Sequence, residues 1–244
     1  MNNELLLGFF PYGLYFDPWY FVVIAPALLL AMLAQWMVQS AYAAGNQIAA
    51  GMSGAMAARR ILDANGLSDV PIEQTPGQLS DHYDPSSRVV RLSSEVYHSN
   101  SMSAVGIAAH EVGHAIQHAQ GYAPLILRNI AVPLANFGSP IGLILIMIAL
   151  ALPLTISTWL AWVGIGLFGM TAAFQIVNLP VEFNASSRAK WALQQMGIVA
   201  PQEMTYVNRV LNAAALTYVA ATLQSVLTVL YYAMIILGNQ RRRD

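Results

Sequence analysis

Three of the five histidines of the chain lie in one short stretch, AAHEVGHAIQH, at positions 110, 114 and 118. On a helix, residues four apart share a face about 6 Å from each other, so His110 and His114 can direct a ring nitrogen at one metal ion. Glu111 directly follows the first histidine and can hold a water molecule without binding the metal itself. This pattern, H-E-x-x-H, is typical of zinc sites in which the glutamate is a general base.

His118 is not expected to complete this site. It lies eight residues beyond His110, which is about 12 Å of rise along a helix. Metzincins reach a third histidine by breaking the helix at a glycine, but Gln117 stands at that position here. We therefore expect His118 to lie just outside the ligands, where it orients them or packs against them.

The third ligand is expected to be an acid from elsewhere, as in sites with two histidines and one glutamate. The chain has no cysteine, which excludes thiolate ligands and a disulfide framework. Glu182 is the strongest candidate, because it follows the longest uncharged stretch, where an ionised residue at a membrane edge needs a reason. The alternative is an acid at a helix N-terminus after Pro180, stabilised by the helix dipole.

The elements that position these residues belong to a membrane protein. Hydrophobic residues make up 57% and charged residues 9% of the 244 residues, against about 25% charged residues in a soluble domain. No charged residue occurs in 18–58, 129–181 or 210–240, and each range contains an apolar run of the roughly 20 residues that cross a bilayer. The net charge of −1, without a clustered basic face, excludes nucleic acid as a partner.

We predict a mainly α integral membrane protein with about four transmembrane helices and a small α+β, zincin-like catalytic portion. In order, we expect a first transmembrane helix, a catalytic segment with the H-E-x-x-H helix, a transmembrane hairpin, a catalytic segment with Glu182, and a last transmembrane helix with a basic tail. These segments are 1–39, 40–128, 129–179, 180–211 and 212–244. The two catalytic segments should emerge on the same side, because two crossings separate them.

The first span could alternatively be a signal peptide. However, the leader before it has no Lys or Arg, and its apolar stretch exceeds the about 7–15 residues of such signals. A retained helix is therefore expected, and residues 40–58 should continue it out of the membrane. The break in the hairpin should lie near Pro153.

Local signals indicate further structure in the first catalytic segment. RVVRLS predicts a strand, which is either an edge strand that takes an extended substrate by β-augmentation or an ordinary paired strand. A serine of the run SNSMS should cap the H-E-x-x-H helix, and Gly121 should end it in a left-handed conformation.

These residues resemble a known family. AAHEVGHAIQH, with LSDHYDPSSRVVRLS before it and PVEFNASSRA after it, is similar to the bacterial neutral zinc metallopeptidases of the YugP type, over about residues 59–223. More distantly, H-E-x-x-H followed by two spans and a glutamate is similar to HtpX and the CAAX prenyl proteases, which are membrane gluzincins. In those relatives the glutamate heads E-x-x-A-D, whose aspartate supports a zinc-binding histidine. Glu182 and Ala185 match that pattern, and Ser186 stands in place of the aspartate.

The resemblance implies a zinc endopeptidase, multi-pass in the bacterial cell membrane. One Zn²⁺ per chain would be bound by His110, His114 and Glu182, with Glu111 as general base and Ser186 beside the ligands. The expected partners are the lipid bilayer and a polypeptide substrate, either membrane-associated or unfolded. A homo-oligomer or a membrane partner protein stays open.

Two further questions remain at the level of sequence. The tetrahedral oxyanion of the substrate needs a second electrophile, and the polar segments offer candidates for this role or for substrate contacts: His82, Tyr83 and Arg188, with Tyr206 and Tyr218 as weaker ones.

The alternative function is a non-catalytic membrane scaffold or partner subunit with a structural zinc site, which would leave Glu111 without a purpose. A metal transporter is disfavoured, because the predicted spans lack acids and histidines.

Overall fold

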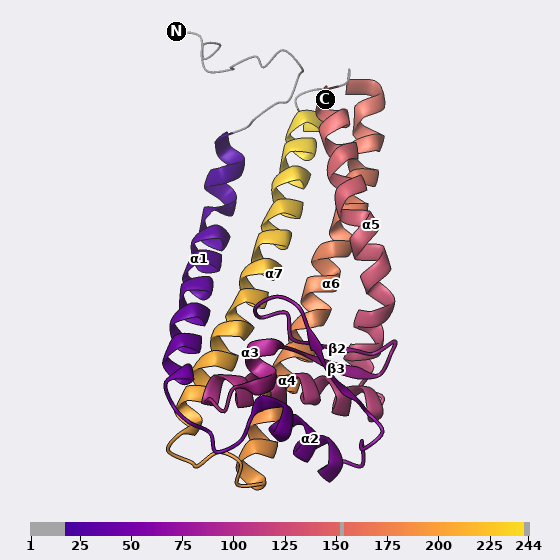
Figure 1. Ribbon diagram of the computed structural model, residues 1–244. Coiled ribbons are helices and arrows are strands. Elements are labelled where there is room, and N and C mark those ends of the chain that lie inside the picture. Colours follow the sequence, from indigo (N-terminus) through magenta and orange to yellow (C-terminus); the bar gives the residue numbers. More distant parts are fainter. Residues whose placement is uncertain (1–17, 152–153, 242–244) are drawn as a thin grey trace. The chain divides into compact units, whose positions relative to one another are not determined.

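The computed structural model describes residues 18–151 and 154–241 (Figure 1). In this part, the helices are α1 (Pro18–Asn46), α2 (Gly54–Ala64), α3 (Ser94–His98), α4 (Met102–Ala119), α5 (Ala123–Ala151), α6 (Leu154–Gln195) and α7 (Met204–Arg241), and the strands are β1 (Ile72–Thr75), β2 (His82–Asp84) and β3 (Val89–Ser93). The expected hairpin break at Pro153, the first 17 residues and the end of the basic tail lie outside the described residues.

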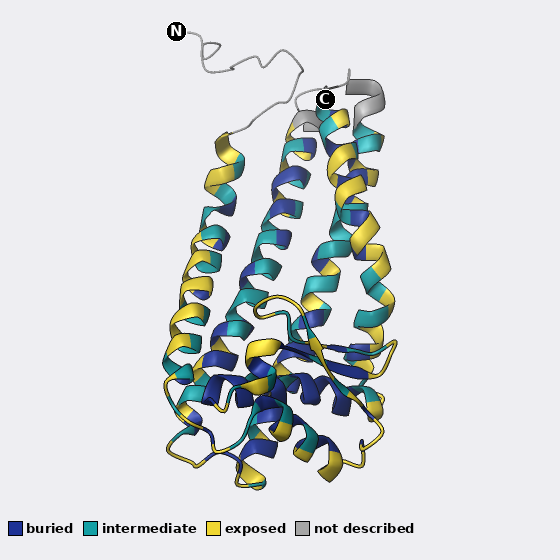
Figure 2. Ribbon diagram, in the orientation of Figure 1, coloured by how far each residue is buried: buried dark blue, intermediate teal, exposed yellow. Residues whose placement is uncertain are grey.

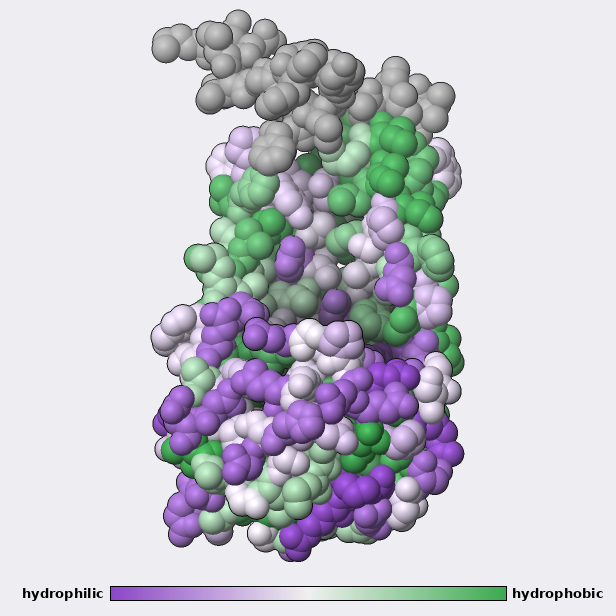
Figure 3. Space-filling view, viewed as in Figure 1, coloured by the Kyte–Doolittle hydropathy of each residue, from purple (hydrophilic) through white to green (hydrophobic). Residues whose placement is uncertain are grey.

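Among the described residues, four helices are long and apolar enough to cross a membrane, namely Pro18–Asn46, Ala123–Leu150, Thr158–Gln195 and Met204–Gly238. Figure 3 shows hydrophobic side chains over α1 and α5, and hydrophilic ones over the sheet and α2. The exposed apolar side chains of α1 and α5 include Trp19, Leu29, Met32, Ile130, Phe137 and Ile144. Such faces suit lipid, and the prediction of a mainly α membrane protein with a small sheet is confirmed.

The chain divides into two compact units, each drawn from separate stretches of sequence. The first unit comprises the described residues of Met1–Leu29, Ile130–Ile176 and Ala221–Asp244. Its apolar core takes side chains from α5, α6 and α7. α5 and α6 approach closely where a Cβ on Gly142 would lie 2.7 Å from the Gly164 carbonyl oxygen, so this crossing accepts no larger residue.

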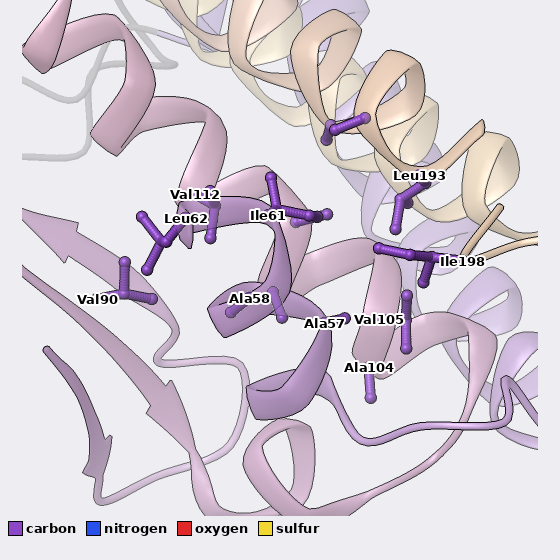
Figure 4. Close-up of a cluster of buried hydrophobic side chains, with 14 of the residues drawn as sticks. Ala57, Ala58, Ile61, Leu62, Val90, Ala104, Val105, Val112, Leu193 and Ile198 are labelled. Carbon is purple, nitrogen blue, oxygen red and sulfur yellow. The ribbon is translucent and has the colours of Figure 1, made fainter. Parts of the chain in front are cut away.

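The second unit, Leu30–Asn129 and Val177–Ala220, is built around α4, which is almost wholly buried (Figure 2). Figure 4 shows part of its core, where apolar side chains of α2, β3 and α4 meet those of the end of α6 and the turn after it. These include Ile61, Leu62, Val90, Val105, Val112, Leu193 and Ile198. Burial of this core therefore fixes α4 against α6.

The sheet of the second unit has, within the described residues, three strands in the order β1-β3-β2. β3 pairs parallel with β1 and antiparallel with β2, so that Val90 lies between Ile72 and Tyr83. The strand predicted from RVVRLS is confirmed, but it is central. The hypothesis that it is an edge strand open to substrate is wrong, because both of its sides are already paired. β1 and β2 form the edges, and β2 contacts α4.

α4 begins and ends where the sequence predicts. The Ser101 hydroxyl caps its N-terminus by accepting a hydrogen bond from the Ala104 N–H at 3.2 Å. At the other end Gly121 has a φ of +62°, and the N–H of Tyr122 donates to the Gln117 carbonyl at 3.0 Å. This is the Schellman arrangement, which needs a left-handed residue.

The first helix continues past residue 39 as expected, but only to Asn46, so the prediction of one helix through residues 40–58 is wrong beyond that point. α1 ends at Asn46 and α2 begins at Gly54, after Ser53 caps it by accepting from the Met56 N–H. Gly51 between them has a φ of +69°, a backbone conformation that a continuous helix cannot contain. The capping by Ser53 and the turn at Gly51 therefore outweigh the helical propensity of the small residues in this segment.

Candidate metal centre

Three side chains of the ligand type converge from α4 and α6 in the second unit. His110 and His114 lie one turn apart on α4, and Glu182 lies on α6. One ligand atom from each lies within 4.8 Å of the others. The Glu182 Oε2 is 3.3 Å from His110 Nε2 and 3.5 Å from His114 Nε2. The structure thus brings together the three residues that were predicted from the sequence as ligands, although Glu182 is distant from the two histidines along the chain.

Both histidines turn the same nitrogen toward this point. The Nδ1 of His110 is 3.1 Å from the Ser186 hydroxyl, and the Nδ1 of His114 is 3.0 Å from the Gln117 side-chain oxygen. Each Nε2 therefore faces Glu182. Two imidazole nitrogens and a carboxylate oxygen are a donor set that zinc prefers, and zinc-binding histidines usually have their other nitrogen hydrogen-bonded. The residues present fit a zinc ion.

The charges of the site also favour a cation. Glu111 and Glu182 are 8% and 3% exposed, and within the described residues no Lys or Arg forms an ion pair with either. Burial raises the pKa of Glu111 above its ordinary value. Burial also opposes the charged form of His114, but the Glu182 carboxylate and the charge of Glu111 outweigh it and raise the pKa of His114. Buried carboxylates of this kind are usually paired or bound to metal.

Glu182 lies well inside α6, which continues from Leu154 through Pro180 to Gln195. The alternative reading of Glu182 as an acid in the first turn of a helix is therefore wrong. Because Ser186 follows Glu182 by one helical turn, both side chains reach the same face of α6. That face carries Glu182 to both histidines and the Ser186 hydroxyl to His110.

His118 and Tyr83 form a separate pair. The Tyr83 hydroxyl lies 2.8 Å from the Nδ1 of His118, and the rings meet edge to face with centroids 5.8 Å apart. They line a pocket of about 230 Å³ together with Arg88 and apolar side chains. His118 is absent from the ligand group, and its bond joins α4 to the edge strand β2 rather than supporting a ligand.

The other candidates for an electrophile lie in different surroundings. His82 is exposed on β2 with its Nδ1 2.8 Å from the Ser80 carbonyl. Arg188 donates to the side chains of Asn184 and Gln120. Tyr206 packs against the apolar core. Tyr218 on α7 lies near the Glu182 carboxylate, so the candidate that the sequence ranked lower is the one at the candidate metal centre.

Gln117 is the residue of this centre that sequence reasoning missed. It has no exposed surface, and its side-chain NH₂ donates to the Val181 carbonyl at 2.8 Å and to the Asn184 side-chain oxygen at 3.0 Å. One signal was available, since Gln117 follows His114 by three residues and so shares its helix face. The sequence showed Gln117 only as the residue that replaces a metzincin glycine.

Comparison with known proteins identifies the family of the chain. The family model described as "Putative neutral zinc metallopeptidase" matches residues 20–237. "Putative membrane protease YugP" of Bacillus subtilis (strain 168) is 47% identical over 222 residues, which cover 90% of this chain and 97% of that protein. No solved structure matches the chain significantly. With four apolar helices, the chain is a multi-pass membrane protein that belongs to this family of bacterial neutral zinc metallopeptidases.

Proposed function

We propose that this protein is a membrane zinc endopeptidase that hydrolyses peptide bonds in membrane-associated or unfolded polypeptides. One observation supports this most directly: the Nε2 atoms of His110 and His114 and the Oε2 of Glu182 face one point, and Glu111 adjoins the first histidine. A purely structural zinc site has no need of a buried carboxylate beside its ligands. The alternative of a non-catalytic scaffold or partner subunit therefore leaves Glu111 unexplained.

In this proposal one Zn²⁺ per chain is held by His110, His114 and Glu182. The ion would supply Lewis acidity, which polarises the scissile carbonyl and makes a water molecule more acidic. Glu111 accepts a proton from the attacking water and passes that proton to the leaving amine. The burial of Glu111 favours this role, because a raised pKa makes the carboxylate a better proton acceptor.

Tyr218 is the residue that we assign to the oxyanion of the substrate. Its phenol reaches Glu182 from α7, and a phenol O–H can donate a hydrogen bond to negative charge that develops on the scissile carbonyl oxygen. His82 and Arg188 are less suited, because His82 is exposed and the Nε and Nη1 of Arg188 already donate to side-chain oxygens.

The substrate is proposed to add to the outer edge of β2. β2 is an edge strand of the described sheet, and Tyr83 ties it to α4 through His118, one turn beyond His114. An extended polypeptide can pair with such an edge through main-chain hydrogen bonds. β1, the other edge, contacts α2 and α3 instead.

Glu111→Gln tests the proposed function, because glutamine keeps the shape of the side chain and cannot accept the proton. We expect the purified variant to hold zinc like the wild type and to cleave an unfolded polypeptide such as casein about 100- to 10,000-fold more slowly. Glu203→Gln makes the same chemical change outside the site and should retain activity. Zinc-loaded wild-type protein that cleaves no polypeptide, or an active Glu111→Gln variant, would favour the scaffold.

A further inference from the structure

Gln117 joins the two helices that carry the metal-binding candidates. On α4, its side-chain oxygen faces the Nδ1 of His114 at 3.0 Å. Toward α6, its side-chain nitrogen reaches the Val181 carbonyl and the Asn184 side-chain oxygen, on either side of Glu182 in sequence. One buried amide therefore touches a ligand of α4 and the backbone next to the ligand of α6.

The hydrogen-bond partners of the Gln117 amide determine which of its atoms faces α6 and which faces His114. Arg188 has only donors, and its Nε lies 2.6 Å from Asn184, so the Asn184 atom there is the oxygen. That oxygen and the Val181 carbonyl can only accept. The Gln117 atom that bonds to both is therefore the NH₂ group, with one N–H for each acceptor. Its oxygen is left to face His114.

The same logic determines the proton on His114. An amide oxygen can only accept a hydrogen bond, so the Nδ1 of His114 must carry the hydrogen. In the neutral imidazole the Nε2 then has the free lone pair, and it is the Nε2 that faces Glu182. His110 is less constrained, because its Nδ1 faces the Ser186 hydroxyl, which can donate or accept.

We propose that Gln117 is a positioning residue for the metal, which holds His114 in its metal-binding tautomer and is itself oriented by Asn184 and Arg188. The inference rests on the proposed function only in taking His114 as a zinc ligand. Arg188 is anchored in turn, since its Nη1 donates to Gln120 at 2.7 Å and its guanidinium lies 6.0 Å from the centre of the Tyr122 ring. The donor-only and acceptor-only groups thus form one chain from the guanidinium to the imidazole.

Gln117→Leu tests this, because leucine has a similar volume and no polar atoms. The Nδ1–H of His114 then loses its acceptor, and the competing tautomer, which has its hydrogen on Nε2, gains population. We expect the zinc dissociation constant, measured by competition with a chelator, to rise about 10- to 100-fold. Loss of the hydrogen bond that orients a metal-binding histidine weakens metal affinity by this factor in other metalloproteins. The visible spectrum of the cobalt-substituted protein should change as the ring reorients.

Asn184 provides a second pair of variants that does not disturb the buried position 117. Asn184→Asp keeps an oxygen for Gln117 and Arg188, whereas Asn184→Leu removes it and frees the Gln117 amide to flip. Asn184→Leu should weaken zinc binding more than Asn184→Asp does, and less than Gln117→Leu. Gln195→Leu makes the same exchange at an exposed position of α6 and serves as the matched control, with wild-type zinc affinity.

The outcomes separate this inference from the proposed function. A Gln117→Leu protein with wild-type helix content and zinc affinity would overturn the positioning role, whether or not the wild type is a peptidase. Equal zinc affinities for the two Asn184 variants would remove Asn184 from the chain of contacts. If the wild type binds one zinc but cleaves nothing, the peptidase proposal fails, and the zinc measurements still decide the role of Gln117.

Discussion

Gly113 on α4 lies directly against the backbone of Ala185 on α6: a Cβ at position 113 would be 2.5 Å from the Ala185 carbonyl oxygen. Gly113 is the residue just before His114, and Ala185 is the residue just before Ser186. The two helices therefore touch backbone to backbone at the level of the candidate metal centre. Only glycine permits this approach, and the approach brings Glu182 within reach of both histidines.

Replacing Gly113 by alanine should push α4 and α6 apart. The added methyl meets a main-chain oxygen that cannot turn away, and overpacking of this kind costs about 1–3 kcal/mol. Glu182 then lies too far from one or both histidines, so zinc affinity should fall together with stability. Thermal unfolding in detergent and chelator competition measure the two effects.

The control for this substitution is Gly169→Ala, in the same helix as Ala185. A Cβ at Gly169 would meet nothing within 4 Å, so only the higher helix propensity of alanine remains, about 0.5–1 kcal/mol. Zinc affinity should not change. If Gly113→Ala binds zinc as tightly as Gly169→Ala does, the close contact does not set the geometry of the ligands.

The roles of Glu182 and His118 are separable by metal analysis. Glu182→Ala removes a proposed ligand and should weaken zinc binding beyond the roughly 100-fold that loss of an outer contact costs. His118→Ala should keep full zinc occupancy and lose only the bond to Tyr83, worth about 1 kcal/mol of stability. Full occupancy in Glu182→Ala together with zinc loss in His118→Ala would overturn the proposed ligand set.

The pH profile should carry the signature of Glu111. Burial raises the pKa of this carboxyl above its ordinary 4.5, and only the ionised form can accept a proton. kcat/KM should therefore fall as the pH drops through a value above 4.5, at pH values where the protein still retains its zinc. If kcat/KM falls only at or below pH 4.5 while the zinc content stays constant, the assignment of Glu111 as a buried base is contradicted.

Tyr218→Phe removes one hydroxyl beside Glu182 and is assayed at saturating zinc, so that any change in metal affinity does not affect the rate. Loss of one donor to an oxyanion lowers kcat about 100- to 1,000-fold, while KM should change little. Tyr206→Phe, on the same helix but against the apolar core, should keep its kcat. An unchanged kcat in Tyr218→Phe would require another electrophile.

The parts of this fold that sequence predicts depend on local rules. The ends of α4 follow from Ser101 and Gly121, because capping needs only neighbouring residues. The four apolar helices follow from the long uncharged ranges. The convergence of His110 and His114 follows from helical spacing, and Glu182 was singled out by its isolation among apolar residues; all three remain proposed ligands.

The remainder depends on contacts between distant segments. The central place of β3 results from parallel pairing with β1, which no turn signal in RVVRLS encodes. Gln117 gains its role only when α6 brings Val181 and Asn184 to it. Tyr218 likewise lies on another helix, so no local sequence pattern predicts that it lies close to Glu182.

β2 is three residues long, which has a consequence for how a substrate would be chosen. Such a short edge offers few main-chain groups, and main-chain pairing reads no side chains. An enzyme that held its substrate there would distinguish proteins by conformation, accepting any stretch that can lie extended and rejecting one that stays folded. Its selectivity would then follow the state of the substrate protein more closely than the residues around the cleaved bond.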